Sequence, residues 1–219
     1  MSNQAKIEDN ALLRRAAGSP PENYVVIIGG IITAEKIRRL PGFLDKADKI
    51  LIGGSVAYTF LAARGDDVGN SKVEADYFDR CRDFLKKASE KNVKIVLPND
   101  HIAAIQVEPE VTIKMIKETE QIPENMMGLD IGFDTVKLFS SEIEDAELIV
   151  WYGPLGVYTI DTFSAGTTKI AEAVAGSSAE SIIIGEELTA AVRQAGYEDR
   201  VSYTTTDSEA VLEFLTGKH

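Results

Sequence analysis

Cysteine and histidine are scarce in this sequence of 219 residues, which contains one cysteine and two histidines. The single Cys81 excludes a disulfide bond within the chain. The histidines, His101 and His219, have no cysteine near them, so the spacing of zinc-binding ligands is missing. We therefore predict no metal site, and a reducing compartment, the cytoplasm, is the expected location.

Long hydrophobic runs are also missing. The apolar runs at residues 25–28 and 182–184 are far shorter than the roughly 20 residues that a membrane-spanning helix needs. The opening Met-Ser-Asn-Gln lacks the apolar stretch of a signal peptide. The sequence thus indicates neither a membrane protein nor a secreted one.

Positive charge is in deficit, because 23 basic residues stand against 35 acidic ones and the formal net charge is −12. A chain of this charge repels nucleic-acid phosphates and anionic lipid headgroups. We expect its partners among small molecules and proteins, with no nucleic acid and no membrane.

Two patterns alternate along the chain. Apolar residues recur at helical spacing within residues 73–88, 136–143 and 163–174. Short runs rich in β-branched residues are apolar throughout, which is typical of strands covered on both faces; they span residues 24–28, 49–52, 93–97, 148–151, 181–184 and 201–204. The alternation predicts a doubly wound, Rossmann-like α/β fold, whose mostly parallel six-stranded sheet has helices on both faces and binds ligands at the carboxyl ends of its strands.

The predicted organisation has two parts. Residues 1–23 form a helix, running through Arg15, and a turn at residues 18–21, and residues 24–219 form one domain. No internal repeat and no further domain are indicated. Residues 99–127 are the least regular stretch, where the pattern of residues 111–118 allows either a helix or a strand.

Glycines mark three strand-to-helix junctions, at Gly29-Gly30, at Gly53-Gly54-Ser55 and at residues 150–157. Glycine lets a ligand approach the backbone closely, and free amides at the start of a helix favour an anion. Tight packing of a strand against a helix, with no ligand, is the commoner explanation of any single junction.

Taken in order, these segments resemble the C-terminal, nucleotide-binding domain of the phosphoglycerate kinase family. The resemblance covers about residues 5 to 218 and rests on Gly29-Gly30 with Glu35-Lys36-Ile37, on residues 48–54 and 57–61, on Leu97-Pro98, and on residues 127–132, 151–157 and 212–218. It implies a site for MgATP or MgADP at Gly29, Gly30, Lys36, Gly53, Gly54, Leu129, Gly153, Pro154 and Val157. A solvent-exposed helix lysine is an equally good explanation of Lys36.

Several positions depart from the family pattern where the resemblance places phosphate. Ile32 stands in place of a lysine, which removes a cation. A run of three glycines, an aspartate and a small hydroxyl residue aligns with residues 184–188, so two carboxylates, Glu186 and Glu187, stand at a helix N-terminus. Glu187 is counted as a tenth residue of the implied nucleotide site, where it is an alternative metal ligand in place of the aspartate.

Other departures fall at the remaining loops of the implied site. Asp207-Ser208-Glu209 replaces a second glycine triplet and is suited to capping a helix. Tyr152 replaces an asparagine and brings an aromatic ring into the space of a nucleotide, and Thr159 replaces a ribose-binding glutamate. Ser55 replaces a third glycine and is suited to capping the helix that begins near Val56.

Two hypotheses follow. The first is a catalytically inactive phosphoglycerate kinase-like domain that serves as a protein-binding, structural or regulatory subunit, with a protein partner or a second copy and no catalytic residue. The alternative is the ATP- and ADP-binding half of a phosphoglycerate kinase, a glycolytic enzyme that transfers a phosphoryl group between 1,3-bisphosphoglycerate and ADP. Because the family's N-terminal, phosphoglycerate-binding domain has no counterpart in the sequence, this half would need a separate substrate-binding domain.

Overall fold

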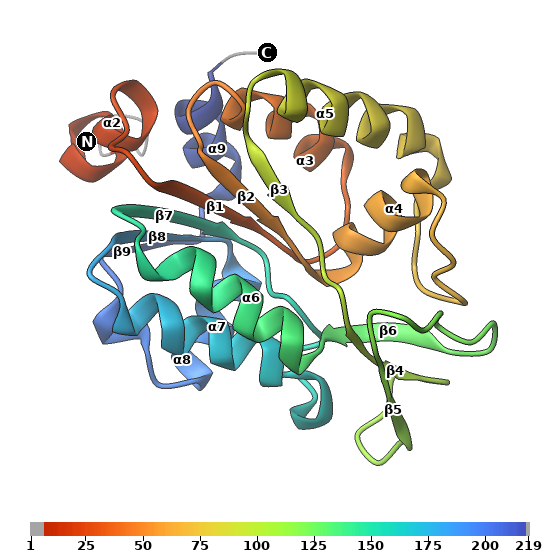
Figure 1. Ribbon diagram of the computed structural model, residues 1–219. Helices are drawn as coiled ribbons and strands as arrows, with labels where there is room; N and C mark the ends of the chain where they lie inside the picture. Colours follow the sequence, from red (N-terminus) through yellow and green to blue (C-terminus); the bar gives the residue numbers. More distant parts are fainter. Residues whose placement is uncertain (1–6, 218–219) are drawn as a thin grey trace.

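A six-stranded parallel sheet forms the centre of the molecule, for which a computed structural model describes residues 7–217. The strand order is β3-β2-β1-β7-β8-β9 (Figure 1). The strands are β1 (Tyr24–Ile28), β2 (Lys49–Ile52), β3 (Lys94–Val96), β7 (Leu148–Tyr152), β8 (Glu180–Ile184) and β9 (Tyr203–Thr205). The predicted doubly wound α/β fold is confirmed, and the predicted strand bounds are right to within two residues.

Successive side chains of the central strands point into two different layers, which is why these strands are apolar throughout. Tyr24, Val26 and Ile28 of β1 pack against one layer, and Val25 and Ile27 pack against the other. The first layer holds α2 (Ala11–Gly18), α3 (Ala34–Arg39), α4 (Gly54–Arg64), α5 (Phe78–Glu90) and α9 (Ser208–Thr216). The second holds α6 (Phe133–Glu144), α7 (Ala165–Gly176) and α8 (Glu186–Gln194) (Figure 1).

A second, antiparallel sheet was not predicted. It consists of β4 (His101–Ala104), β5 (Ile113–Ile116) and β6 (Met127–Ile131), in the order β5-β4-β6. Of the two alternatives for residues 111–118, the strand is therefore right and the helix is wrong. The small sheet lies beyond the carboxyl ends of the central strands (Figure 1), and its buried Ala103 and Ile116 pack against Tyr58 and Leu61 of α4.

The helices begin and end at local signals. Asn10 caps α2 by accepting a hydrogen bond from the Leu13 amide at 3.0 Å, so the predicted opening helix is interrupted there. Residues 1–6 of the predicted opening helix lie outside the described residues. Helix α5 begins at Phe78, and Val73 precedes it. The short 3-10 turns are η1 (Leu40–Phe43), η2 (Ala75–Tyr77), η3 (Asp161–Phe163) and η4 (Glu198–Arg200). Within residues 7–217, no helix has both the length and the hydropathy of a membrane span.

A buried carboxylate directly before β4 joins this strand to the start of α6. Gly132 precedes α6 and has no side chain for capping, and Asp100 takes over that role. One Asp100 oxygen accepts from the Asp134 amide at 2.9 Å, and the other accepts from the Thr135 amide at 2.7 Å and from its hydroxyl at 2.6 Å. Asp100 therefore satisfies amides that would otherwise be buried without a partner.

Replacement of Asp100 by alanine tests this cap. We expect the Asp100→Ala variant to lose roughly 1–3 kcal/mol of unfolding free energy, because buried amides lose their acceptor. Urea denaturation followed by circular dichroism measures the change. The matched control is Asp134→Ala in the first turn of the same helix, where the exposed side chain should matter by less than about 0.5 kcal/mol. Equal losses in the two variants would contradict the assignment.

Candidate functional site

A cavity of about 410 Å³ lies where the carboxyl ends of the central strands meet the small sheet. Six of the ten predicted binding residues line it: Gly30, Gly54, Leu129, Pro154, Val157 and Glu187. The resemblance did not identify several further lining residues, namely Tyr58, Lys72, Met127, Gly128 and Tyr158. Tyr58, Met127 and Gly128 belong to strings that carry the resemblance, but they were not assigned to the site because their place at the cavity depends on how α4 packs against the unpredicted small sheet. Lys72 and Tyr158 lie outside those strings.

Three other predicted glycines, Gly29, Gly53 and Gly153, do not line the cavity but hold the strand ends together. The Gly29 amide donates to the Tyr152 carbonyl and the Gly53 amide donates to the Ile28 carbonyl, each at 2.8 Å. A methyl group on Gly29 would overlap the carbonyl oxygens of Gly153 and Pro154. The close approach that demands glycine at these positions is therefore backbone against backbone.

The amides of the cavity-lining glycines are also engaged. The Gly30 amide donates to the Pro154 carbonyl at 2.5 Å, and the Gly54 amide donates to the Leu155 carbonyl at 3.1 Å. The Val56 amide, in the first turn of α4, donates to the Gly30 carbonyl at 3.1 Å. These three amides are therefore engaged within the protein and are not free to bind a phosphate.

Lys36 is buried, which excludes the exposed-lysine explanation. Its Nζ donates to the carbonyl oxygens of Gly29 at 2.6 Å and Ile31 at 2.9 Å and lies 4.5 Å from the centroid of the Tyr152 ring. Burial lowers the pKa of Lys36 to about 8, while the carboxylates of Glu187 and Glu35 act in the opposite direction. In this arrangement Lys36 ties the first junction together and does not line the cavity.

Negative charge gathers at the α8 side of the cavity. Glu186 and Glu187 occupy the first turn of α8, and Glu187 lines the cavity. Burial raises the pKa of Tyr158, and the charges of both glutamates raise it further. These two carboxylates repel an anion near the start of α8 and oppose its attraction to the helix dipole.

The other departures from the family pattern have local structural roles. The Asp207 side chain caps α9 by accepting from the Ala210 amide, as its position predicted. The Ser55 hydroxyl donates to the Gly30 carbonyl at 3.2 Å and makes no cap hydrogen bond in α4, so the predicted cap is wrong. Ile32 is buried, Thr159 lines the cavity, and Tyr152 is half-buried beside Lys36.

Asp130 lies directly beneath the cavity wall, next to Leu129, and is fully buried. One of its oxygens accepts from the Gly166 amide at 2.7 Å and the other from the Ile131 amide at 2.9 Å. Methyl groups on Gly156 or Gly166 would overlap this carboxylate. Burial raises the pKa of Asp130 to about 7, although its two backbone hydrogen bonds lower it.

Tyr58 and His101 form part of the wall at the base of the small sheet. The Tyr58 hydroxyl lies 3.3 Å from His101 Nδ1, and burial raises the pKa of Tyr58. Burial lowers the pKa of His101 to about 4, so this histidine is neutral at physiological pH. Among residues 7–217, no group of three or more His, Cys, Asp or Glu residues is arranged to hold a metal.

Comparisons with known proteins point in one direction. A family model described as phosphoglycerate kinase matches residues 7–218. The phosphoglycerate kinase of Thermosipho africanus is 44% identical over 209 residues, which are 94% of this chain and 52% of that protein. That of Acidobacterium capsulatum is 44% identical over 207 residues, 94% of this chain and 51% of that protein.

Solved structures agree with the sequence relatives. The phosphoglycerate kinase of Coxiella burnetii superposes on this chain with a TM-score of 0.91 at 36% sequence identity. The superposition covers 97% of this chain and 54% of that protein. The phosphoglycerate kinase of Pyrococcus horikoshii superposes with a TM-score of 0.84 at 25% sequence identity, and the superposition covers 99% of this chain and 54% of that protein. The chain thus spans about half the length of the proteins it matches.

The buried Asp130 predicts a particular pH dependence of stability. Its folded pKa of about 7 is raised above the ordinary value of 3.8, so the native state holds a proton that the unfolded chain has already lost. The stability that this proton contributes is complete below about pH 4 and is lost as the pH rises through about 7. Relative to Asp130→Asn, which cannot ionise, the unmodified protein should therefore become progressively less stable as the pH rises from about 4 to about 7.

Urea denaturation of both proteins at unit pH steps measures this difference. Asp145→Asn, an exposed substitution of the same type, is the control and should run parallel to the unmodified protein. Parallel profiles for Asp130→Asn as well would contradict a raised pKa at this carboxylate.

Proposed function

Because the chain belongs to the phosphoglycerate kinase family, we propose that it is the adenine-nucleotide-binding half of such an enzyme. The observation that carries the proposal is the cavity at the carboxyl ends of β1, β2 and β7, which gathers six of the predicted binding residues. Ligands of doubly wound folds bind at this edge of the sheet. The cavity volume of about 410 Å³ lies within the usual range for small-ligand sites.

The walls of the cavity suit the nucleoside part of a nucleotide. Leu129, Val157 and Met127 provide apolar side chains, and Gly30 and Gly54 provide flat backbone with no side chain. A planar base packs well in such a cavity, because it can contact the apolar side chains on one side and the glycine backbone on the other without a clash with a side chain. Hydroxyl groups of Tyr158 and Thr159 line the same cavity and are suited to hydrogen bonds with a ribose.

Phosphoryl transfer requires an acceptor held in line with the nucleotide and shielded from water. The curated relatives are about twice as long as this chain. The proposal therefore assigns phosphoglycerate binding to a separate domain, and this chain contributes the nucleotide side of the cleft.

Calorimetry with MgADP tests the binding site. We expect saturable binding, and we expect Val157→Asp to weaken it about tenfold or more, because a carboxylate would replace an apolar wall group and repel the ligand. Ile113→Asp, an equally charged change on the exposed strand β5, should leave the affinity unchanged. Absence of binding at millimolar MgADP would overturn the proposal.

A second candidate, the catalytically inactive subunit, is favoured by one observation: the α8 side of the cavity presents carboxylates, while Lys36 is tied to backbone carbonyls. A coupled phosphoglycerate kinase assay distinguishes the two candidates. Turnover after addition of the separately produced N-terminal half of a relative supports the kinase half. MgADP binding without turnover supports the inactive subunit.

The same carboxylates make a prediction about phosphate. We expect adenosine and ADP, measured without magnesium, to bind with affinities within about threefold of each other, because Glu187 opposes the gain from phosphate contacts. Glu187→Gln should strengthen ADP binding by about fivefold and leave adenosine binding unchanged. Glu172→Gln on the exposed face of α7 is the charge-matched control. An ADP affinity that far exceeds that of adenosine in the unmodified protein would contradict this role of Glu187.

A further inference from the structure

The outer edge of the central sheet at β3 is open in the part of the chain that the structure describes. Within residues 7–217, β2 is the only strand that pairs with β3. The Lys94 amide donates to the Asp48 carbonyl at 2.9 Å, so the backbone groups of Lys94 and Val96 face β2. Because backbone groups alternate in direction along a strand, those of Ile95 and Leu97 face the open edge.

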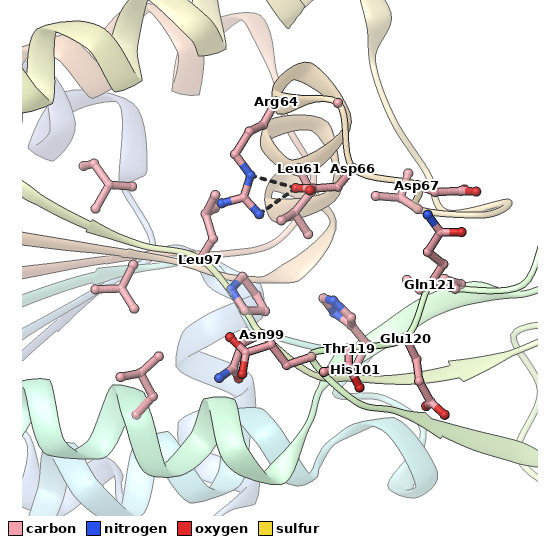
Figure 2. A pocket seen from close by; sticks show the side chains of 18 of the residues that line it. Leu61, Arg64, Asp66, Asp67, Leu97, Asn99, His101, Thr119, Glu120 and Gln121 are labelled. Carbon is pink, nitrogen blue, oxygen red and sulfur yellow. Dashed lines mark hydrogen bonds and ion pairs between the residues drawn. The ribbon is translucent and has the colours of Figure 1, made fainter.

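A groove of about 700 Å³ runs along this edge (Figure 2). Residues 94–99 line it, and each layer of helices adds a leucine, Leu85 from α5 on one face of the sheet and Leu138 from α6 on the other. Both leucines are only half-buried. An added strand directs its side chains alternately to the two faces, so it would find an apolar contact on each.

The charge of the groove is negative. Its carboxylates are Asp66, Asp67, Glu118 and Glu120. Its two basic side chains are paired: Arg64 Nε donates to Asp66 at 2.7 Å, an ion pair visible in Figure 2, and Lys94 pairs with Glu142 of α6. Asp67 and Glu120 come from loops on opposite sides of the opening (Figure 2).

We propose that this groove binds an extended, basic peptide segment of a partner protein, which joins the sheet as a strand beside β3. The backbone of Ile95 and Leu97 supplies the hydrogen bonds, and Leu85 and Leu138 contact apolar side chains of the peptide. The four carboxylates named above form an acidic rim, which selects lysine or arginine. A second copy of this chain is a poor occupant, because edge-to-edge pairing would bring two acidic rims together in a protein whose net charge is −12. The groove is separate from the nucleotide cavity, so this proposal does not depend on the proposed function.

The test uses a fluorescein-labelled peptide of four valines flanked by two lysines on each side, with blocked ends, so that apolar side chains point to both faces of the sheet. Fluorescence anisotropy measures its binding to the full chain. We expect saturable binding that weakens at high salt. The same peptide with its four consecutive valines N-methylated keeps its charge but loses the backbone donors on both edges of its apolar centre, and we expect it to bind about tenfold more weakly or not at all. Equal binding of the two peptides would overturn the proposal, because it would show charge attraction without strand pairing.

Variants of the chain locate the binding surface. The double variant Glu118→Gln/Glu120→Gln should weaken binding by about threefold or more. Its control, Glu144→Gln/Asp145→Asn at the exposed end of α6, changes the net charge equally and should have no effect. Loss of affinity in the control to the same degree would overturn the location.

Ile95→Pro removes an outward amide while leaving the ladder to β2 intact, and proline is tolerated at such edge positions. We expect this variant to abolish peptide binding and Ile95→Val to preserve it, with circular dichroism to confirm folding of both. If Ile95→Pro does not fold, the methylated peptide still decides the question. Sedimentation tests whether a second copy occupies the groove instead. A dimer that is strengthened by Glu118→Gln/Glu120→Gln and dissociated by the peptide would show that a second copy is the occupant, and this result would overturn the proposal.

Discussion

Contact of backbone with backbone at the ends of β1, β2 and β7 is the constraint on which the candidate site depends. Gly29 meets Gly153 and Pro154 so closely that any side chain would overlap a carbonyl oxygen. Gly54 adopts a φ of 59° and meets the backbone of Gly30, a conformation and a distance that suit glycine alone. The junction therefore fixes the position of three strand ends, and the cavity lies directly beside it.

This contact has a chemical consequence. The amides of Gly30, Gly54 and Val56 satisfy carbonyl groups within the protein, and the ammonium of Lys36 satisfies two more. Donors that would otherwise face a ligand are used to hold the strand ends together. The cavity beside them is consequently lined by apolar groups and hydroxyls, and its charged members, Lys72 and Glu187, come from separate elements.

The central sheet could be predicted because its strands are buried on both faces, which makes a run such as Tyr24–Ile28 apolar throughout. The small sheet could not be predicted in the same way. Strand β5 has three exposed residues out of four, and β4 contains two alanines and a histidine, so neither shows the composition of a buried strand. Their pairing depends on contacts with α4 that are distant in sequence.

Some residues of the candidate site could likewise be predicted from the sequence, and others could not. Positions such as Gly30, Leu129 and Val157 could be found from the resemblance, because they belong to local strings that keep their order. The burial of Lys36, and its contact with the Tyr152 ring, depend on how α3 packs against the end of β7, and no local pattern encodes that packing.

Backbone contacts and side-chain chemistry are separable in this fold. The glycine junctions require only that certain positions lack a side chain, and they make no demand on the residues that begin α8 or on the other residues that line the cavity. Glu186 and Glu187 show this freedom, since each adds a carboxylate to the first turn of α8 without disturbing the strand that precedes it. A change of charge at the cavity therefore leaves the sheet intact, and the fold constrains the shape of the site more strongly than it constrains the chemistry performed there.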